Sequence, residues 1–96
     1  MAKGTPGNIS RTNENAKLLV KWQDVNGELF TERTETRDIS DSGISFYLKT
    51  PIWVDSHLTI TIASSALFGR LASISAKVVR VQVDAAERQL VAARFD

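Results

Sequence analysis

Apolar and polar residues alternate strictly in several short segments of this sequence, and this alternation restricts the fold more than any other feature. Leu18, Val20 and Trp22 occupy every second position in the first such segment. A period of two residues is typical of a strand with one buried face. The same pattern recurs in segments 44–48 and 58–62. Because each segment is short and is followed by turn-forming residues, the sequence predicts an all-β fold.

Turn residues separate the alternating segments and allow them to be placed along the chain. The pair Asn26-Gly27 follows the first segment, and its tolerance of positive φ predicts a type I′ hairpin turn. The predicted strands are approximately 17–23, 28–37, 44–49, 58–62, 71–83 and 90–95. The last of these strands would close the open edge that the others leave. We therefore expect a small six-stranded antiparallel barrel.

Two places in the last third of the sequence interrupt the regular pattern. The alternation changes phase at Val78-Val79, which predicts a β-bulge that would re-aim Arg80. Further on, Asp84 and Glu87 have the spacing of a helix capping box, so a helix is an alternative there. The residues that follow alternate with a period of two, and we therefore predict a strand.

Length and composition describe one small domain. The chain has 96 residues, 43% of them hydrophobic, and no cysteine, so a hydrophobic core without disulfides must hold the fold. The first residues lack the apolar segment of a signal peptide, and no segment is long enough to span a membrane. We expect a cytoplasmic protein without a membrane partner, with residues 1–10 as a flexible N-terminal arm and residues 11–96 as the barrel domain.

The charge pattern restricts the class of ligand. The formal net charge is only +1, and the basic excess lies before residue 24. A protein that holds a nucleic acid through its overall field usually carries a concentrated basic face, so we expect no DNA or RNA partner. The charged side chains of the second predicted strand are interpreted as a solvated sheet surface; they are Glu28, Glu32, Arg33 and Glu35.

Few residues offer catalytic or metal-binding chemistry. His57 is the single histidine, and we interpret it as a surface loop residue because no second ligand accompanies it. Its neighbours Asp55 and Ser56 cannot form a catalytic triad with it, since adjacent residues do not converge. The sequence also lacks a phosphate-binding P-loop and a dinucleotide fingerprint. We therefore expect no enzyme activity, no metal and no resident cofactor.

The connector Asp38-Ile39-Ser40-Asp41-Ser42-Gly43 concentrates short oxygen-bearing side chains at one predicted turn. A structural interpretation is that Asp and Ser bond the local backbone and that Gly43 supplies a positive φ. A functional interpretation is that Asp38 and Ser40 face a ligand and that Gly43 permits close approach of the backbone. A carboxylate would suit the N1–H and N2–H2 donors of a guanine, and an arginine would suit its O6 and N7 acceptors. The residues alone leave both interpretations open.

The order of these motifs resembles the PilZ domain family, the bacterial receptor modules for cyclic di-GMP (c-di-GMP). The resemblance covers nearly the whole chain and includes a complete DxSxxG motif at Asp38–Gly43. Arg11-Thr12 before the first strand, Asp24–Gly27 at the hairpin and Val78–Val81 in the fifth strand are also similar to PilZ sequences. The second PilZ motif, RxxxR, is incomplete. If Arg11 is its second arginine, Gly7 stands in place of the first.

The resemblance implies a PilZ-like barrel of the split-barrel type that binds c-di-GMP. The implied ligand-binding residues are Arg11, Asp38, Ser40, Gly43 and Arg80. The incomplete arginine motif leaves an alternative, a PilZ adaptor that binds no nucleotide. Such an adaptor would dock a protein partner through exposed aromatic residues such as Tyr47, Trp53 or Phe68. An oligonucleotide-binding barrel is disfavoured, because the second strand is acidic and no basic strand face carries interleaved aromatics.

Overall fold

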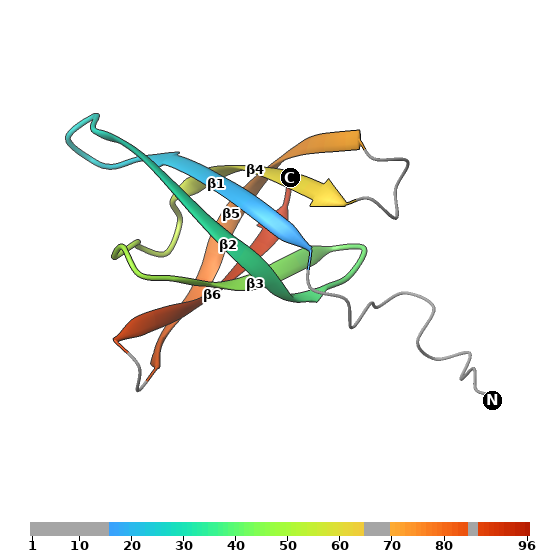
Figure 1. The fold of residues 1–96 in the computed structure, drawn as a ribbon. Coiled ribbons are helices and arrows are strands. Elements are labelled where there is room, and N and C mark those ends of the chain that lie inside the picture. Colours follow the sequence, from blue (N-terminus) through green and yellow to red (C-terminus); the bar gives the residue numbers. More distant parts are fainter. Residues whose placement is uncertain (1–15, 65–69, 85–86) are drawn as a thin grey trace.

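The structure, a computed structural model, describes residues 16–64, 70–84 and 87–96. Six antiparallel strands close into one barrel in the order β1-β2-β3-β6-β5-β4 (Figure 1). The strands are β1 (Lys17–Gln23), β2 (Leu29–Ile39), β3 (Gly43–Leu48), β4 (His57–Ser64), β5 (Arg70–Asp84) and β6 (Arg88–Phe95). The predicted six-stranded barrel is confirmed. Its second strand continues to Ile39, two residues beyond the predicted end. In the described ranges, no helix is long and apolar enough to cross a membrane.

The barrel interior is filled by the alternate apolar residues that defined the sequence pattern. The buried side chains include Leu18, Val20 and Trp22 of β1 and Ile44, Phe46 and Leu48 of β3. Full burial of one such side chain contributes about 1.5–3 kcal/mol relative to exposure. At one end of the barrel the Trp22 ring stacks on Phe30, with ring centroids 5.5 Å apart. The single-face alternation in these strands therefore correctly predicted the core.

The β1–β2 hairpin differs from the predicted two-residue turn. Gly27 has a φ of +84°, whereas Asn26 does not adopt the positive φ that a type I′ turn requires. Gln23 pairs with Leu29, so the loop is longer than predicted. The Asp24 carboxylate stabilises it, because Oδ1 accepts hydrogen bonds from the backbone N–H groups of Asn26 and Glu28, both at 2.9 Å. The prediction placed a hairpin correctly and its turn type wrongly.

The predicted bulge in β5 is present and determines which residues face outward. The register with β6 shifts between Val78 and Arg80, so that Val79 is the extra residue. Val78 remains buried, whereas Arg80 pairs with Ala92 and is exposed. In a regular strand of the same sequence, with Val79 paired like its neighbours, the alternation would turn Arg80 toward the core. The bulge therefore places an arginine on the outer face of the sheet.

The helical alternative after Asp84 is wrong, because that part of the chain is a strand. β6 forms ladders with β3 on one side and with β5 on the other. Glu87 adopts a φ of +60° at the tight connection between β5 and β6. This pairing satisfies the backbone of β6 on both sides, so tertiary context outweighs the local helical signal.

The seam between β2 and β3 is held partly by side chains. The ladder joins only three residue pairs between Thr36 and Ile39 of β2 and the start of β3. Where the strands diverge, Thr34 Oγ1 donates to the Tyr47 carbonyl at 2.7 Å. The Glu32 carboxylate then accepts from the backbone N–H groups of Lys49 at 2.7 Å and Thr50 at 3.1 Å. Interpreting Glu32 as a merely solvated surface charge was therefore wrong.

The β3–β4 loop is anchored to the barrel and presents one aromatic side chain. Ile52 is 3% exposed and belongs to the core, whereas Trp53 is 64% exposed. Hydrogen bonds from Asp55 N to Val78 O and from Val78 N to Ser56 O attach the loop to β5. The next residue, His57, is exposed as predicted but begins β4 rather than lying in a loop.

Candidate functional site

The DxSxxG residues form the junction between β2 and β3. Asp38 lies within β2 and Gly43 begins β3, so the true loop is three residues long rather than six. Ser40 N donates to Gly43 O at 2.9 Å and closes this short turn. The Ser40 hydroxyl lies 3.4 Å from the hydroxyl of Ser42. The turn thus brings two hydroxyl groups together at one end of the barrel.

Gly43 is required by close packing rather than by its φ. The structural interpretation predicted a positive φ for Gly43, and this is wrong. Among the described glycines, Gly27 is the one with a positive φ. A Cβ added at Gly43 would lie 2.6 Å from the Ala93 carbonyl oxygen of β6. Such a distance is too short for a carbon–oxygen contact. The glycine therefore allows β3 and β6 to approach each other at the start of their ladder.

A hollow on the outer face of the barrel unites much of the predicted site. Its volume is about 340 Å³, and Asp38, Ser40 and Gly43 line one part of it. Residues of β5 and β6 complete it, among them Val79, Ala92 and Arg94. The hollow places a carboxylate and hydroxyl acceptors near a guanidinium donor. This combination suits a ligand that carries both a polar ring edge and a negative charge.

Arg94 is a site residue that the sequence reasoning missed. Its Cα pairs with Gly43 across the β3–β6 ladder, and it is an exposed residue that lines the hollow. Within the described ranges it has no ion-pair partner, unlike Arg37, whose Nη1 lies 3.5 Å from Asp38 Oδ2. Its outward place in the last predicted strand was visible from the alternation. Its position beside Gly43 could not be predicted, because it depends on the pairing of two strands that are distant in the sequence.

The other two predicted arginines are placed differently. Arg80 is exposed, and its Cα pairs with Ala92, which lines the hollow. Arg80 itself is not among the lining residues. Arg11 lies outside the described residues, as does Gly7. The structure thus brings together Asp38, Ser40 and Gly43, sets Arg80 beside them, and gives no position for the N-terminal arginine.

The aromatic residues of the adaptor alternative are also separated. Trp53 is exposed on the β3–β4 loop, whereas Tyr47 is half-buried beneath the side chain of Arg88. Phe68 lies outside the described residues.

Comparison with known protein families gives one decisive result. The family model of the PilZ domain matches residues 9–96. This chain belongs to the PilZ domain family. The match includes the DxSxxG turn and the bulged β5 strand, which are the features that carried the resemblance. No curated protein matches the sequence.

Solved structures show that other proteins have the same fold. The B. subtilis inhibitor of motility MotI/DgrA superposes with a TM-score of 0.72 at 19% identity, over 91% of this chain and 41% of that chain. The K. pneumoniae MrkH–c-di-GMP complex superposes with a TM-score of 0.63 at 19% identity, over 100% of this chain and 45% of that chain. The PilZ domain of E. coli YcgR with c-di-GMP superposes with a TM-score of 0.60 at 15% identity, over 88% of this chain and 73% of that chain. This PilZ chain therefore spans less than half the length of MotI and MrkH.

Proposed function

We propose that this PilZ chain is a receptor module that binds c-di-GMP and catalyses no reaction. The observation that carries the proposal is the outer hollow, where the DxSxxG residues of a PilZ barrel meet Arg94. The structures of MrkH and YcgR named above contain c-di-GMP. A protein of this kind would bind its ligand in the cytoplasm, where we expect this chain to act.

The proposed contacts follow from the hydrogen-bonding groups of the ligand. The carboxylate of Asp38 would accept from N1–H and N2–H2 of a guanine, and Ser40 would supply a hydroxyl. Gly43 would leave room beside the backbone, as it has no side chain. Arg94 would donate to a phosphate or to the guanine acceptors. Arg11 is proposed to hold a phosphate from the N-terminal side, and Arg80 to contact a base from the neighbouring strand.

Binding is then linked to signalling through the N-terminal segment. If the ligand recruits Arg11, the residues before β1 are drawn toward the hollow. Ordering a segment on binding costs conformational entropy, and it changes the surface offered to another protein. A receptor without catalytic residues can transmit a signal in this way.

Titration calorimetry with c-di-GMP tests the proposed function. Wild-type protein should bind, and Asp38→Ala should weaken binding by roughly 10- to 100-fold, since a hydrogen bond to a charged group contributes about 1.5–3 kcal/mol. Arg11→Ala should have an effect in the same direction. Asp41→Ala is the matched control, because Asp41 belongs to the same loop but does not line the hollow. Wild-type heats equal to those of dilution at high ligand concentration would contradict the proposal.

The adaptor alternative is favoured by one observation, the exposure of Trp53 on an anchored loop. A rigid, exposed tryptophan loses little conformational entropy on binding and is a frequent centre of protein interfaces. Absence of c-di-GMP binding in the calorimetric experiment would favour this second function. Substitution of Trp53 by alanine should then abolish binding to the partner and leave the fold unchanged.

A further inference from the structure

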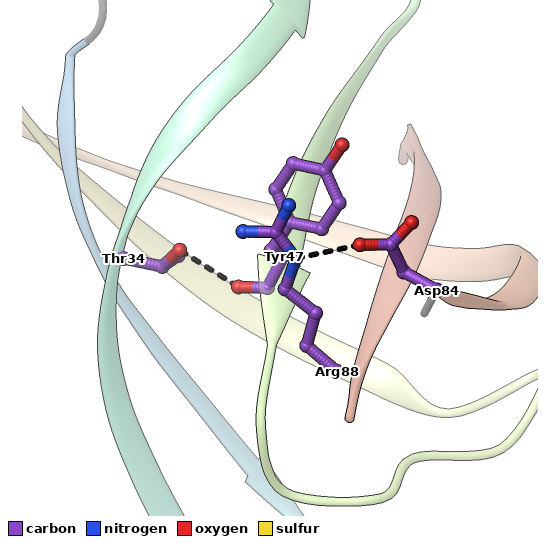
Figure 2. A network of polar contacts seen from close by, with 4 residues as sticks. All are labelled: Thr34, Tyr47, Asp84 and Arg88. Atoms are coloured by element: carbon purple, nitrogen blue, oxygen red, sulfur yellow. Dashed lines mark hydrogen bonds and ion pairs between the residues drawn. The ribbon is translucent and has the colours of Figure 1, made fainter. Parts of the chain in front are cut away.

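A stacked cation–aromatic pair lies on the outer face of the barrel and has no role in the contacts proposed above. The guanidinium carbon of Arg88 lies 3.8 Å from the centroid of the Tyr47 ring. Arg88 Nε donates to Asp84 Oδ2 at 2.8 Å, and Figure 2 shows the guanidinium against the ring with this bond leading to the carboxylate at its side. A carboxylate that holds Nε fixes the orientation of the guanidinium plane. We call Tyr47 and Arg88 together the Tyr47–Arg88 platform.

The platform continues the surface of the hollow along β3. Ser45 lines the hollow, and Tyr47 is the next residue of β3 on the same face. Residues two apart on a strand are separated by about 7 Å, which is comparable to the length of a purine ring system. The Thr34 hydroxyl donates to the Tyr47 carbonyl at 2.7 Å (Figure 2). This bond fixes the backbone beneath the ring, so the platform is held on both sides.

The charges of the platform suit a neutral ring better than a phosphate. Asp84 compensates the positive charge of Arg88, whereas Arg94 in the hollow has no ion-pair partner within the described ranges. The side chain of Arg88 is 41% exposed, because one face of the guanidinium covers Tyr47 and the rest meets solvent. Arginine planes and aromatic rings are surfaces on which unpaired bases stack.

We propose that the Tyr47–Arg88 platform is a base-stacking subsite for a purine of the bound ligand. The inference rests on the proposed function, in which the ligand is c-di-GMP. One guanine lies at the DxSxxG hollow, and the other guanine stacks on the open face of the Arg88 guanidinium. Asp84 acts as a positioning residue, since it orients Arg88 and does not contact the ligand.

Calorimetry with c-di-GMP on three variants tests the platform. Arg88→Lys keeps the charge but removes the plane, and it should weaken binding on the order of 10-fold, because base stacking on a side chain is worth about 1–3 kcal/mol. Tyr47→Phe keeps the ring and should bind within about twofold of wild type. Arg33→Lys is the matched control. Its Cα pairs with Leu19 of β1, on another part of the barrel, and its Kd should equal that of wild type.

Nuclear magnetic resonance supplies a readout that a merely structural role would not give. Tyr47 is the single tyrosine of the sequence, so its ring resonances are unambiguous. Addition of c-di-GMP should produce intermolecular Overhauser effects between guanine protons and the Arg88 side chain, with smaller shifts of the Tyr47 ring. These effects should disappear in Arg88→Lys.

The outcomes separate the platform from the receptor function. A wild-type protein that binds c-di-GMP while Arg88→Lys binds equally well would overturn the platform and leave the receptor function intact. A wild-type protein that does not bind c-di-GMP would overturn both. Weaker binding by Arg88→Lys without contacts between guanine and Arg88 would also overturn stacking, because the effect would then be indirect.

Discussion

At the scale of single residues, Gly43 connects the candidate site with the barrel itself. From the sequence, the glycine of the DxSxxG motif could be needed for ligand binding, for a turn or for packing of the sheet. The structure shows that it is needed for the close packing of β3 against β6. The nearest atom to an added Cβ would be a backbone carbonyl of β6. A carbonyl in a strand ladder cannot move away without breaking its pairing. This residue of the DxSxxG motif thus has a structural role.

Gly43→Ala should therefore lower the stability of the barrel even without ligand. Crowding of this kind in a packed region costs typically about 1–3 kcal/mol. Urea denaturation followed by circular dichroism measures the change in the free energy of unfolding. Ser42→Ala, at an exposed neighbouring position, should stay close to wild type. A Gly43→Ala protein of full stability that binds ligand poorly would show that the glycine serves the ligand alone.

At the scale of elements, the bulged β5 shows what a sequence pattern reveals and what it conceals. The change of phase at Val78-Val79 predicted the bulge, because a period of two cannot change parity in a regular strand. The alternation likewise predicted the buried residues of β1 and β3. The extent of the β2–β3 loop was not predictable, since Ile39 and Gly43 become strand residues only through pairing.

Deletion of Val79 should remove the bulge and leave the barrel folded. Val78 and Arg80 already pair with the consecutive residues Ala93 and Ala92, so the shortened strand would alternate regularly, with Val78 inward, Arg80 outward and Val81 inward. Dispersion of amide resonances measures whether the unique fold is kept. Val79→Ala retains the bulge and should also fold normally, because Val79 is 48% exposed. A collapsed spectrum for the deletion variant alone would contradict this expectation and show that the barrel needs the bulge.

At the scale of the whole molecule, the barrel is closed but its seams are unequal. β2 and β3 share three ladder pairs, whereas β4 and β5 share eight. Glu32 and Thr34 supply the missing connections with their side chains. No sequence pattern marks Glu32 for this task, because its acceptor role depends on the backbone of a distant loop. For the same reason, Arg94 could be placed outward from sequence but not beside Gly43.

Hydrogen exchange should reveal this inequality. Amides of β2 and β3 along the seam should exchange faster than those between β4 and β5, because fewer backbone bonds must open. Glu32→Ala should accelerate exchange at Lys49 and Thr50 further. Glu35→Ala, at an exposed position of the same strand, should not. Uniform protection around the barrel would contradict an unequal seam.

The two tryptophans occupy opposite environments, and this gives the protein two built-in optical reporters. Trp22 is 5% exposed and stacked on Phe30, whereas Trp53 is 64% exposed on an anchored loop. A soluble quencher therefore reaches the indole of Trp53 and is excluded from that of Trp22. The fluorescence of Trp22 therefore reports unfolding of the interior. The fluorescence of Trp53 reports the binding of any molecule that covers the β3–β4 loop.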